Sequence, residues 1–328
     1  MTPEGWLPRA LNGGWSYRDR IDAGSAGLSA TAFYAGRYRH SAQPEWLRRL
    51  EAGEMERNGQ PLLLDGELVA GDRLLWRRPP WWEEAVPTDW AVVHDDGDLL
   101  VLDKPSGLPV LPAGGWLEHT VLRLLERRHQ GDPAGVPRPV HRLGRFTSGL
   151  LVCARRPATR AWLSARLRES TAGGMAAGEG SAAATACRKL YRALLVPGAL
   201  PLAPGDSLAI TTPIGRRDHP QLGQIWCAAA GLRPGDLAAH SSLTLLERQA
   251  EGDLVQVAIA SGRPHQIRIH CAAVGAPLLG DPLYGPGGLA EAAARPGDGG
   301  YRLQAWRLEL VRPDGTRLVL EAPQALVV

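Results

Sequence analysis

The chain has 328 residues, of which 44% are hydrophobic and 22% are charged, and its formal net charge at pH 7 is only +3. These proportions exclude the disordered and membrane classes of protein, and no apolar run approaches the length that crosses a membrane. The length predicts one large domain and one small domain.

Four widely spaced cysteines form no Cys-x-x-Cys pair, and prolines interrupt the N-terminal segment where a signal peptide would be apolar. These features predict a reduced protein of the cytoplasm. The basic residues, mostly arginines, concentrate in the middle of the chain, at 123–128, 138–145 and 155–168. Each cluster fits either a contact surface for the phosphates of a nucleic acid or the solvated face of a helix.

The first predicted module covers residues 1–80. The pattern predicts, in chain order, a helix, a turn and two short strands, at Glu45–Gly53, Asn58–Gly59, Leu62–Leu64 and Leu74–Trp76. The proline-rich segment Arg77–Pro87 predicts an irregular linker, because proline restricts its own backbone and that of the preceding residue. A second domain is therefore predicted over 81–328.

The second domain alternates strands with helices. Strands are predicted at Leu99–Leu102, Leu150–Ala154, Leu190–Val196, Leu243–Leu246, Leu254–Ile259, Leu303–Leu310 and Arg317–Leu320, and helices at Thr120–His129, Pro157–Arg168 and Ser261–Gly275. Hairpins join two pairs of these strands, which predicts the α+β class, with a mixed, largely antiparallel central sheet flanked by helices. The small-residue segment 170–186 predicts a flexible insertion.

Four segments carry polar residues in an order that points to chemistry. They are Asp98–Pro109, His141–Gly149 (His-Arg-Leu-Gly-Arg-Phe-Thr-Ser-Gly), Lys189–Ala193, and Gly262–His270 followed by Gly280–Gly285. With these segments the chain resembles the RluA-type RNA pseudouridine synthases over about residues 87–323. The module over 1–80 loosely resembles the ribosomal-protein-type RNA-binding module often joined to them, and it also fits a small cap without RNA contact.

The resemblance implies that uridine in structured RNA, rRNA or tRNA, is isomerised to pseudouridine by a monomer without cofactor or metal. The C1′–N1 bond breaks, the base turns and a C1′–C5 bond forms, on a uridine that has left its stack. The resemblance also assigns roles. Tyr191 packs on the base and helps proton transfer, although a strand tyrosine also fits a core position, and Arg268 pairs with the loop aspartate. The implied substrate-binding residues are Lys104, His141, Arg142, Arg145, Thr147, His265 and Gln266.

Gly144 stands where the loop of that family carries its catalytic aspartate. Nucleophilic or general-base work needs a side chain, and a buried guanidinium left without its partner costs about 3–5 kcal/mol. Three hypotheses follow. A carboxylate comes from elsewhere, with Asp281, which also fits a turn, Asp103 and Asp218 as candidates. Alternatively, the protein binds RNA without catalysis, or it docks a protein through Trp76–Trp90. The first is preferred, because Tyr191 and Arg268 are retained.

A metal reading of His265 and His270 is not adopted. Their five-residue offset places them poorly for one helix face, and no third ligand is adjacent in the sequence.

Overall fold

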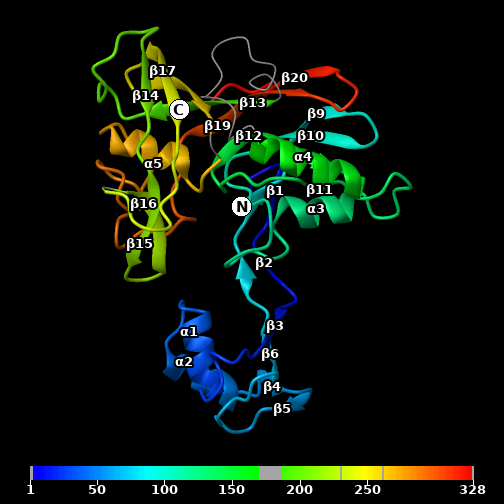
Figure 1. Cartoon of the computed structure of the whole chain (residues 1–328). Coiled ribbons are helices and arrows are strands. Elements are labelled where there is room, and N and C mark those ends of the chain that lie inside the picture. Colours follow the sequence, from blue (N-terminus) through cyan, green and yellow to red (C-terminus); the bar gives the residue numbers. More distant parts are fainter. Residues whose placement is uncertain (1–2, 170–186, 230, 261, 327–328) are drawn as a thin grey trace. The chain divides into compact units, whose positions relative to one another are not determined.

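The computed structural model describes residues 3–169, 187–229, 231–260 and 262–326 (Figure 1). The chain folds into two compact units. The larger contains Met1–Pro8, Ala85–Arg217 and Ile225–Val328, and the smaller contains Arg9–Glu84 and Asp218–Gln224. The predicted insertion at 170–186 lies outside the described residues.

A ten-stranded sheet forms the larger unit. Its spatial order is β14-β17-β18-β13-β19-β12-β10-β9, with β11 paired to β12 and β20 paired to β19. The strands are β9 (Ala91–Asp95), β10 (Leu99–Lys104), β11 (Arg138–Pro139), β12 (Thr147–Ala154), β13 (Cys187–Leu195), β14 (Ser207–Ile210), β17 (Ser241–Arg248), β18 (Asp253–Ile259), β19 (Leu303–Val311) and β20 (Arg317–Glu321). Within the described residues, β12 and β19 are the one parallel pair of this sheet. The predicted α+β class with a mixed, largely antiparallel sheet is confirmed.

Three helices pack on this sheet, α3 (Val121–Arg128), α4 (Pro157–Glu169) and α5 (Gln266–Ala273). In β10, Leu100 and Leu102 pack with α3, while Leu99 and Val101 pack with α4. Successive strand residues point to opposite faces, so this buried run is sandwiched between two helices. Helix α5 packs its Ile267 and Cys271 on the β17–β18 part of the sheet.

Two further pairs of short strands lie outside the ten-stranded sheet. They are β1 (Trp6–Leu7) with β8 (Val86–Pro87), and β15 (Ile214–His219) with β16 (Gly223–Ala228).

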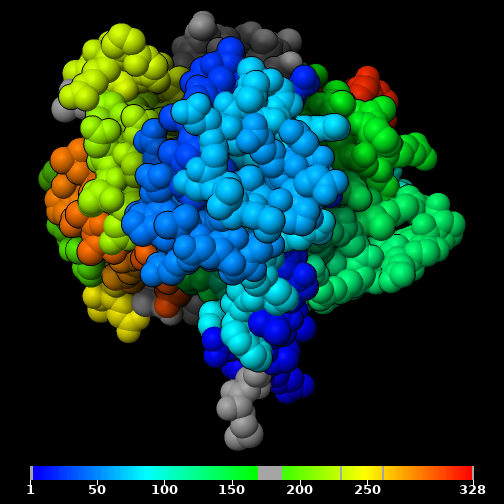
Figure 2. Space-filling view, turned by 90° about the horizontal axis from the view of Figure 1, so that it is seen from below, coloured from blue at the N-terminus to red at the C-terminus, as the bar shows by residue number. Residues whose placement is uncertain are grey.

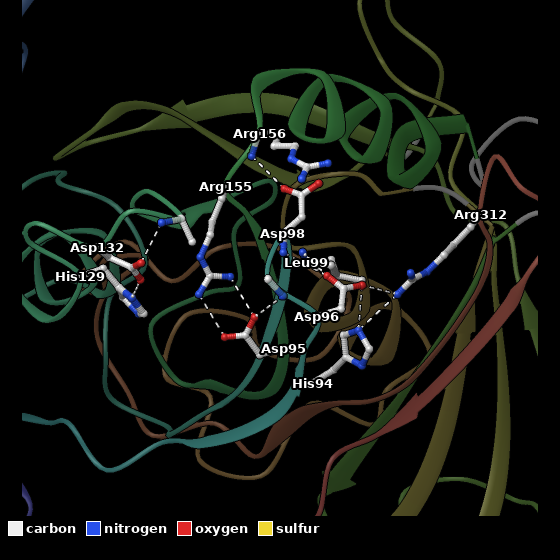
Figure 3. A network of polar contacts seen from close by, with 12 residues as sticks. His94, Asp95, Asp96, Asp98, Leu99, His129, Asp132, Arg155, Arg156 and Arg312 are labelled. Atoms are coloured by element: carbon white, nitrogen blue, oxygen red, sulfur yellow. Dashed lines mark hydrogen bonds and ion pairs between the residues drawn. The ribbon is translucent and has the colours of Figure 1, made fainter.

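A polar network fixes the turn between β9 and β10 (Figure 3). Arg155, whose side chain is only 5% exposed, donates to both oxygens of Asp95 at 2.9 and 3.0 Å. Asp98 accepts the backbone N–H of Arg156 at 2.9 Å and the Thr159 hydroxyl at 2.6 Å. These bonds anchor the start of α4 to the turn between β9 and β10.

The smaller unit has a four-stranded sheet and two helices. Its sheet has the order β3 (Trp15–Arg20), β6 (Arg73–Arg78), β4 (Met55–Arg57), β5 (Gln60–Pro61), beside α1 (Ala30–Arg37) and α2 (Gln43–Glu51), while β2 (Ala10–Leu11) pairs with β7 (Trp82–Glu83). Its core is aromatic. Trp46 meets Trp76 edge-on at 4.6 Å and Tyr34 stacks on Trp46 at 4.9 Å. Figure 2 shows one face of this unit, mostly in blue.

Three predicted elements are wrong in part. The helix of 261–275 begins only at Gln266, because His265 has a left-handed φ of 54° that interrupts a right-handed helix. Leu62–Leu64 form no strand, since β5 ends at Pro61. The linker Arg77–Pro87 holds the end of β6 and the short strands β7 and β8. Strand β3 and helix α1 were not predicted.

Strands β12 and β19 approach each other closely at Gly149. Its φ is +95°, and a Cβ there would lie 2.3 Å from the backbone oxygen of Ala305. We expect Gly149→Ala to lower the free energy of unfolding by about 3 kcal/mol or more, because strain and collision add. Gly97→Ala is the control, with a φ of +89° and open space around the Cβ. Its expected cost is about 1 kcal/mol. Equal costs in denaturant titrations would contradict this account of the strand contact.

Candidate active site

A pocket of about 500 Å³ opens on the larger unit. Three of the four polar segments meet there, and the predicted site residues His141, Arg142, Gly144, Thr147, Tyr191, His265, Gln266 and Arg268 all line it. The pocket also includes Arg168, Lys189, Arg263 and Tyr301, which the sequence analysis did not select. Lys189 and Arg263 lie within two of these segments, whereas Tyr301 has no local pattern that marks it.

The pocket is strongly cationic. Five of its lining residues are arginine or lysine, namely Arg142, Arg168, Lys189, Arg263 and Arg268. Among the described lining residues there is no aspartate or glutamate. Such a surface suits a ligand with phosphate groups, and arginine in particular binds phosphate oxygens in pairs.

The histidines of the pocket add no charge at neutral pH. Burial, with the nearby Lys189, lowers the pKa of His141 to about 4. Burial and the neighbouring Arg268 lower the pKa of His265 to about 4. The neutral His141 ring accepts the backbone N–H of Val152 at 3.0 Å through Nε2. The positive charge therefore comes from guanidinium and ammonium groups alone.

Arg268 is held by a buried carboxylate. Its Nε and Nη2 each lie 2.7 Å from an oxygen of Asp281, and the two side chains are 3% and 1% exposed. Asp281 also accepts the backbone N–H of Leu283 at 2.9 Å. The guanidinium lies 4.1 Å from the ring centre of Tyr301. A two-bond ion pair with these extra contacts gives the charged head one fixed orientation.

Tyr191 lies in the middle of β13, opposite Val257 of β18 and Ala305 of β19. It is half-buried and lines the pocket. Burial, with the nearby Cys187, raises the pKa of Tyr191 to about 12, so its phenol is neutral at pH 7. A flat, neutral ring on a rigid strand offers a surface on which a base can stack.

Lys104 and Arg145 do not line the pocket. The ammonium of Lys104 is buried and donates to the carbonyls of Pro105, Leu108 and Arg145 at 2.8, 2.9 and 3.1 Å. The Arg145 guanidinium stacks on Trp116 at 4.3 Å. Both residues join the segment Asp98–Pro109 to the His141–Gly149 loop.

The amide of Gln266 has partners within the protein. Its Nε2 donates to the backbone oxygen of His240 at 2.8 Å and to Ser241 at 3.0 Å, and its Oε1 accepts the N–H of Arg263 at 3.1 Å. These bonds position the Arg263 turn.

The three candidate replacement carboxylates do not reach the pocket lining. Asp281 is paired with Arg268. Asp103 is buried in β10, where burial raises its pKa, and it is not a lining residue. Asp218 is exposed and belongs to the smaller unit. Gly144 faces Tyr301 instead, because a Cβ at Gly144 would lie 2.2 Å from the Tyr301 hydroxyl.

Within the described ranges, no group of three or more His, Cys, Asp or Glu side chains is placed to hold a metal ion. None of the helices described is long and apolar enough to span a membrane.

Comparisons with known proteins identify the family. Residues 98–273 match the family described as RNA pseudouridylate synthase. An uncharacterised RNA pseudouridine synthase of Synechocystis sp. is 41% identical, over 84% of this chain and 87% of its own. RNA pseudouridine synthase 5 of Oryza sativa subsp. japonica is 36% identical, over 94% of this chain and 86% of its own. Among solved structures, the human protein named RNA Pseudouridylate Synthase Domain Containing 1 matches with a TM-score of 0.52 at 22% identity. The match covers 72% of this chain and 84% of the human chain, which shows a shared fold.

The buried ion pair gives a stability prediction. We expect Asp281→Asn to lower the free energy of unfolding by about 3–5 kcal/mol, because it leaves Arg268 buried without a counter-charge. Glu84→Gln is the matched control, since the Arg9–Glu84 pair is 57% and 66% exposed. That change should cost under about 1 kcal/mol. Denaturant unfolding measures both, and similar costs would contradict the role given to Asp281.

Acid should destabilise the protein through its buried histidines. Burial lowers the pKa of His270 to about 4, and this ring is fully buried between Ser241 and the Thr212 carbonyl. An unfolded histidine has a pKa of about 6.5. The stabilising contribution of His270 is therefore present above about pH 6.5 and lost as the pH falls through about 4, by about 3 kcal/mol. Calorimetry of His270→Asn should show a shallower fall in melting temperature than the parent protein. An identical slope would contradict it.

Proposed function

Since this chain belongs to the RNA pseudouridylate synthase family, of the RluA type, we propose that its cationic pocket binds a flipped uridine of structured RNA and isomerises it there to pseudouridine. The observation that carries the proposal is the convergence of three separate sequence segments on this one pocket. A reaction on a base inside RNA requires a pocket for the extruded nucleotide and cations for its phosphates.

In this proposal the residues divide the work by their chemistry. Tyr191 stacks on the base, because its ring is neutral and rigidly held on β13. Arg142, Arg168 and Arg263 bind the flanking phosphates, because they line the pocket and a guanidinium matches the geometry of phosphate oxygens. Arg268 faces the reacting sugar, with its orientation fixed by Asp281.

The proposal includes Gly144 as a replacement for the catalytic aspartate of the His-Arg-Leu-Asp loop. The loop motif around it supports this, together with the lack of a carboxylate among the described lining residues. Asp281 serves as the partner of Arg268, because both of its oxygens bind that guanidinium and its side chain is 1% exposed. We therefore assign no attacking role to Asp281, Asp103 or Asp218.

The RNA and the setting are also part of the proposal. A relative named ribosomal large subunit pseudouridine synthase D, from Neisseria meningitidis, is 29% identical over 87% of this chain. Large-subunit rRNA is thus the first substrate to test, with tRNA as the second. We also propose that the smaller unit contacts RNA. Most of this unit belongs to the module predicted from the sequence over residues 1–80. We propose a cytoplasmic monomer.

Mapping pseudouridine in total rRNA and tRNA, with and without this gene, tests the proposal. We expect at least one uridine to lose its modification on deletion and to regain it when the chain is supplied. Arg268→Lys should fail to restore it, because lysine cannot make the two-bond contact with Asp281. Arg127→Lys, on the exposed face of α3, is the matched control and should restore it. An unchanged map on deletion would argue against the proposal, and RNA binding without modification would favour a non-catalytic scaffold.

A further inference from the structure

We propose that Tyr301 performs the step assigned to the loop aspartate in RluA-type enzymes, with its phenolic oxygen acting at C1′ of the bound uridine. This inference rests on the proposed function. It answers which group reacts in a pocket whose described lining contains no carboxylate.

The hydroxyl of Tyr301 lies beside Gly144. A Cβ added to Gly144 would lie 2.2 Å from the hydroxyl oxygen of Tyr301 and 3.5 Å from its ring carbon Cζ. In an aspartate, the Cβ–Cγ and Cγ–Oδ bonds have lengths of roughly 1.5 and 1.2 Å. Together they place the carboxylate oxygen at a similar distance from the Cβ. The phenolic oxygen is therefore as far from this Cβ as a carboxylate oxygen of an aspartate would be. Glycine at 144 and tyrosine at 301 fit one another, and an aspartate at 144 would collide with the phenol.

Neighbouring side chains hold the ring of Tyr301 in its orientation. The ring of Tyr301 lies under the Arg268 guanidinium at 4.1 Å and meets Phe146 edge-on at 5.9 Å. Only 3% of the residue is exposed, yet it lines the pocket. Asp281 binds the edge of the guanidinium while Tyr301 covers its face. A ring confined on these sides can present its hydroxyl in one place only.

The hydroxyl of Tyr301 makes few hydrogen bonds within the protein. Among the described residues, the Tyr301 hydroxyl has one hydrogen-bond partner, Thr147 Oγ1 at 3.3 Å. The other tyrosine over Arg268, Tyr284, is committed, because its hydroxyl donates to the Trp226 carbonyl and contacts His265, both at 2.7 Å. Tyr301 thus retains capacity to bond with a substrate.

The chemistry balances with one phenol. The oxygen of Tyr301 attacks C1′ as the C1′–N1 bond breaks, the bond's electron pair passes to the uracil ring, and the phenolic proton moves to N1. The freed base then turns. C5 attacks C1′, the bond from C1′ to the phenolic oxygen breaks with its electrons returning to that oxygen, and the C5 proton passes to it. One C–N bond becomes one C–C bond, with the phenol regenerated.

The test compares three proteins on the uridine found by mapping: the parent, Tyr301→Phe and Tyr284→Phe. We expect Tyr301→Phe to lose at least about 100-fold in kcat while its RNA affinity and melting temperature stay close to the parent's. Tyr284→Phe removes the same atom from the neighbouring ring and should retain most of the activity. Full activity of Tyr301→Phe overturns the inference. An inactive parent protein rejects the proposed function instead, so the two failures are distinguishable.

A second comparison tests the shared position. Tyr301→Ala should be inactive, and adding Gly144→Asp to it should restore activity, because the space left by the phenol admits a carboxylate. Gly144→Asp in the presence of Tyr301 should gain nothing. If the double variant folds, binds the RNA and is no more active than Tyr301→Ala, the two side chains do not share a position and the inference fails.

Discussion

The ion pair between Arg268 and Asp281 is the contact on which the architecture of the pocket depends. Both side chains are almost fully buried, so each charge must find its partner inside the protein. The pair joins the first turn of α5 to the segment at 280–284, and Tyr301 covers the guanidinium face at 4.1 Å. Three successive segments of the chain are thereby fixed around one cation.

This arrangement explains how the chain tolerates glycine at position 144. An unpaired buried guanidinium is costly, and the sequence analysis expected that something must compensate for the missing loop carboxylate. Asp281 supplies the counter-charge from behind the pocket, and the hydroxyl of Tyr301 lies where a side chain at 144 would begin. On the proposed function, the electrostatic role and the space of a loop aspartate are divided between these two residues.

Sequence patterns predicted what depends on local order. Continuous apolar runs predicted β10 and β12. Turn residues between apolar segments predicted the hairpins β17–β18 and β19–β20. The start of α5 does not, because the left-handed backbone of His265 coincides with a contact between its ring and Tyr284, nineteen residues away. Tyr301 was missed for the same reason. Its place in the pocket comes from tertiary packing, and nothing beside it in the chain marks it.

The charge balance of the pocket favours a phenol over a carboxylate. Its histidines are neutral at pH 7, so the positive charge of the pocket lies on arginine and lysine side chains. RNA brings its own phosphates, and a carboxylate in the lining would repel them and compete for Arg268. A neutral hydroxyl adds no such repulsion, and it can release a proton to the departing base and take one back from C5. A tyrosine can therefore serve this pocket without disturbing the Arg268–Asp281 pair that orients it.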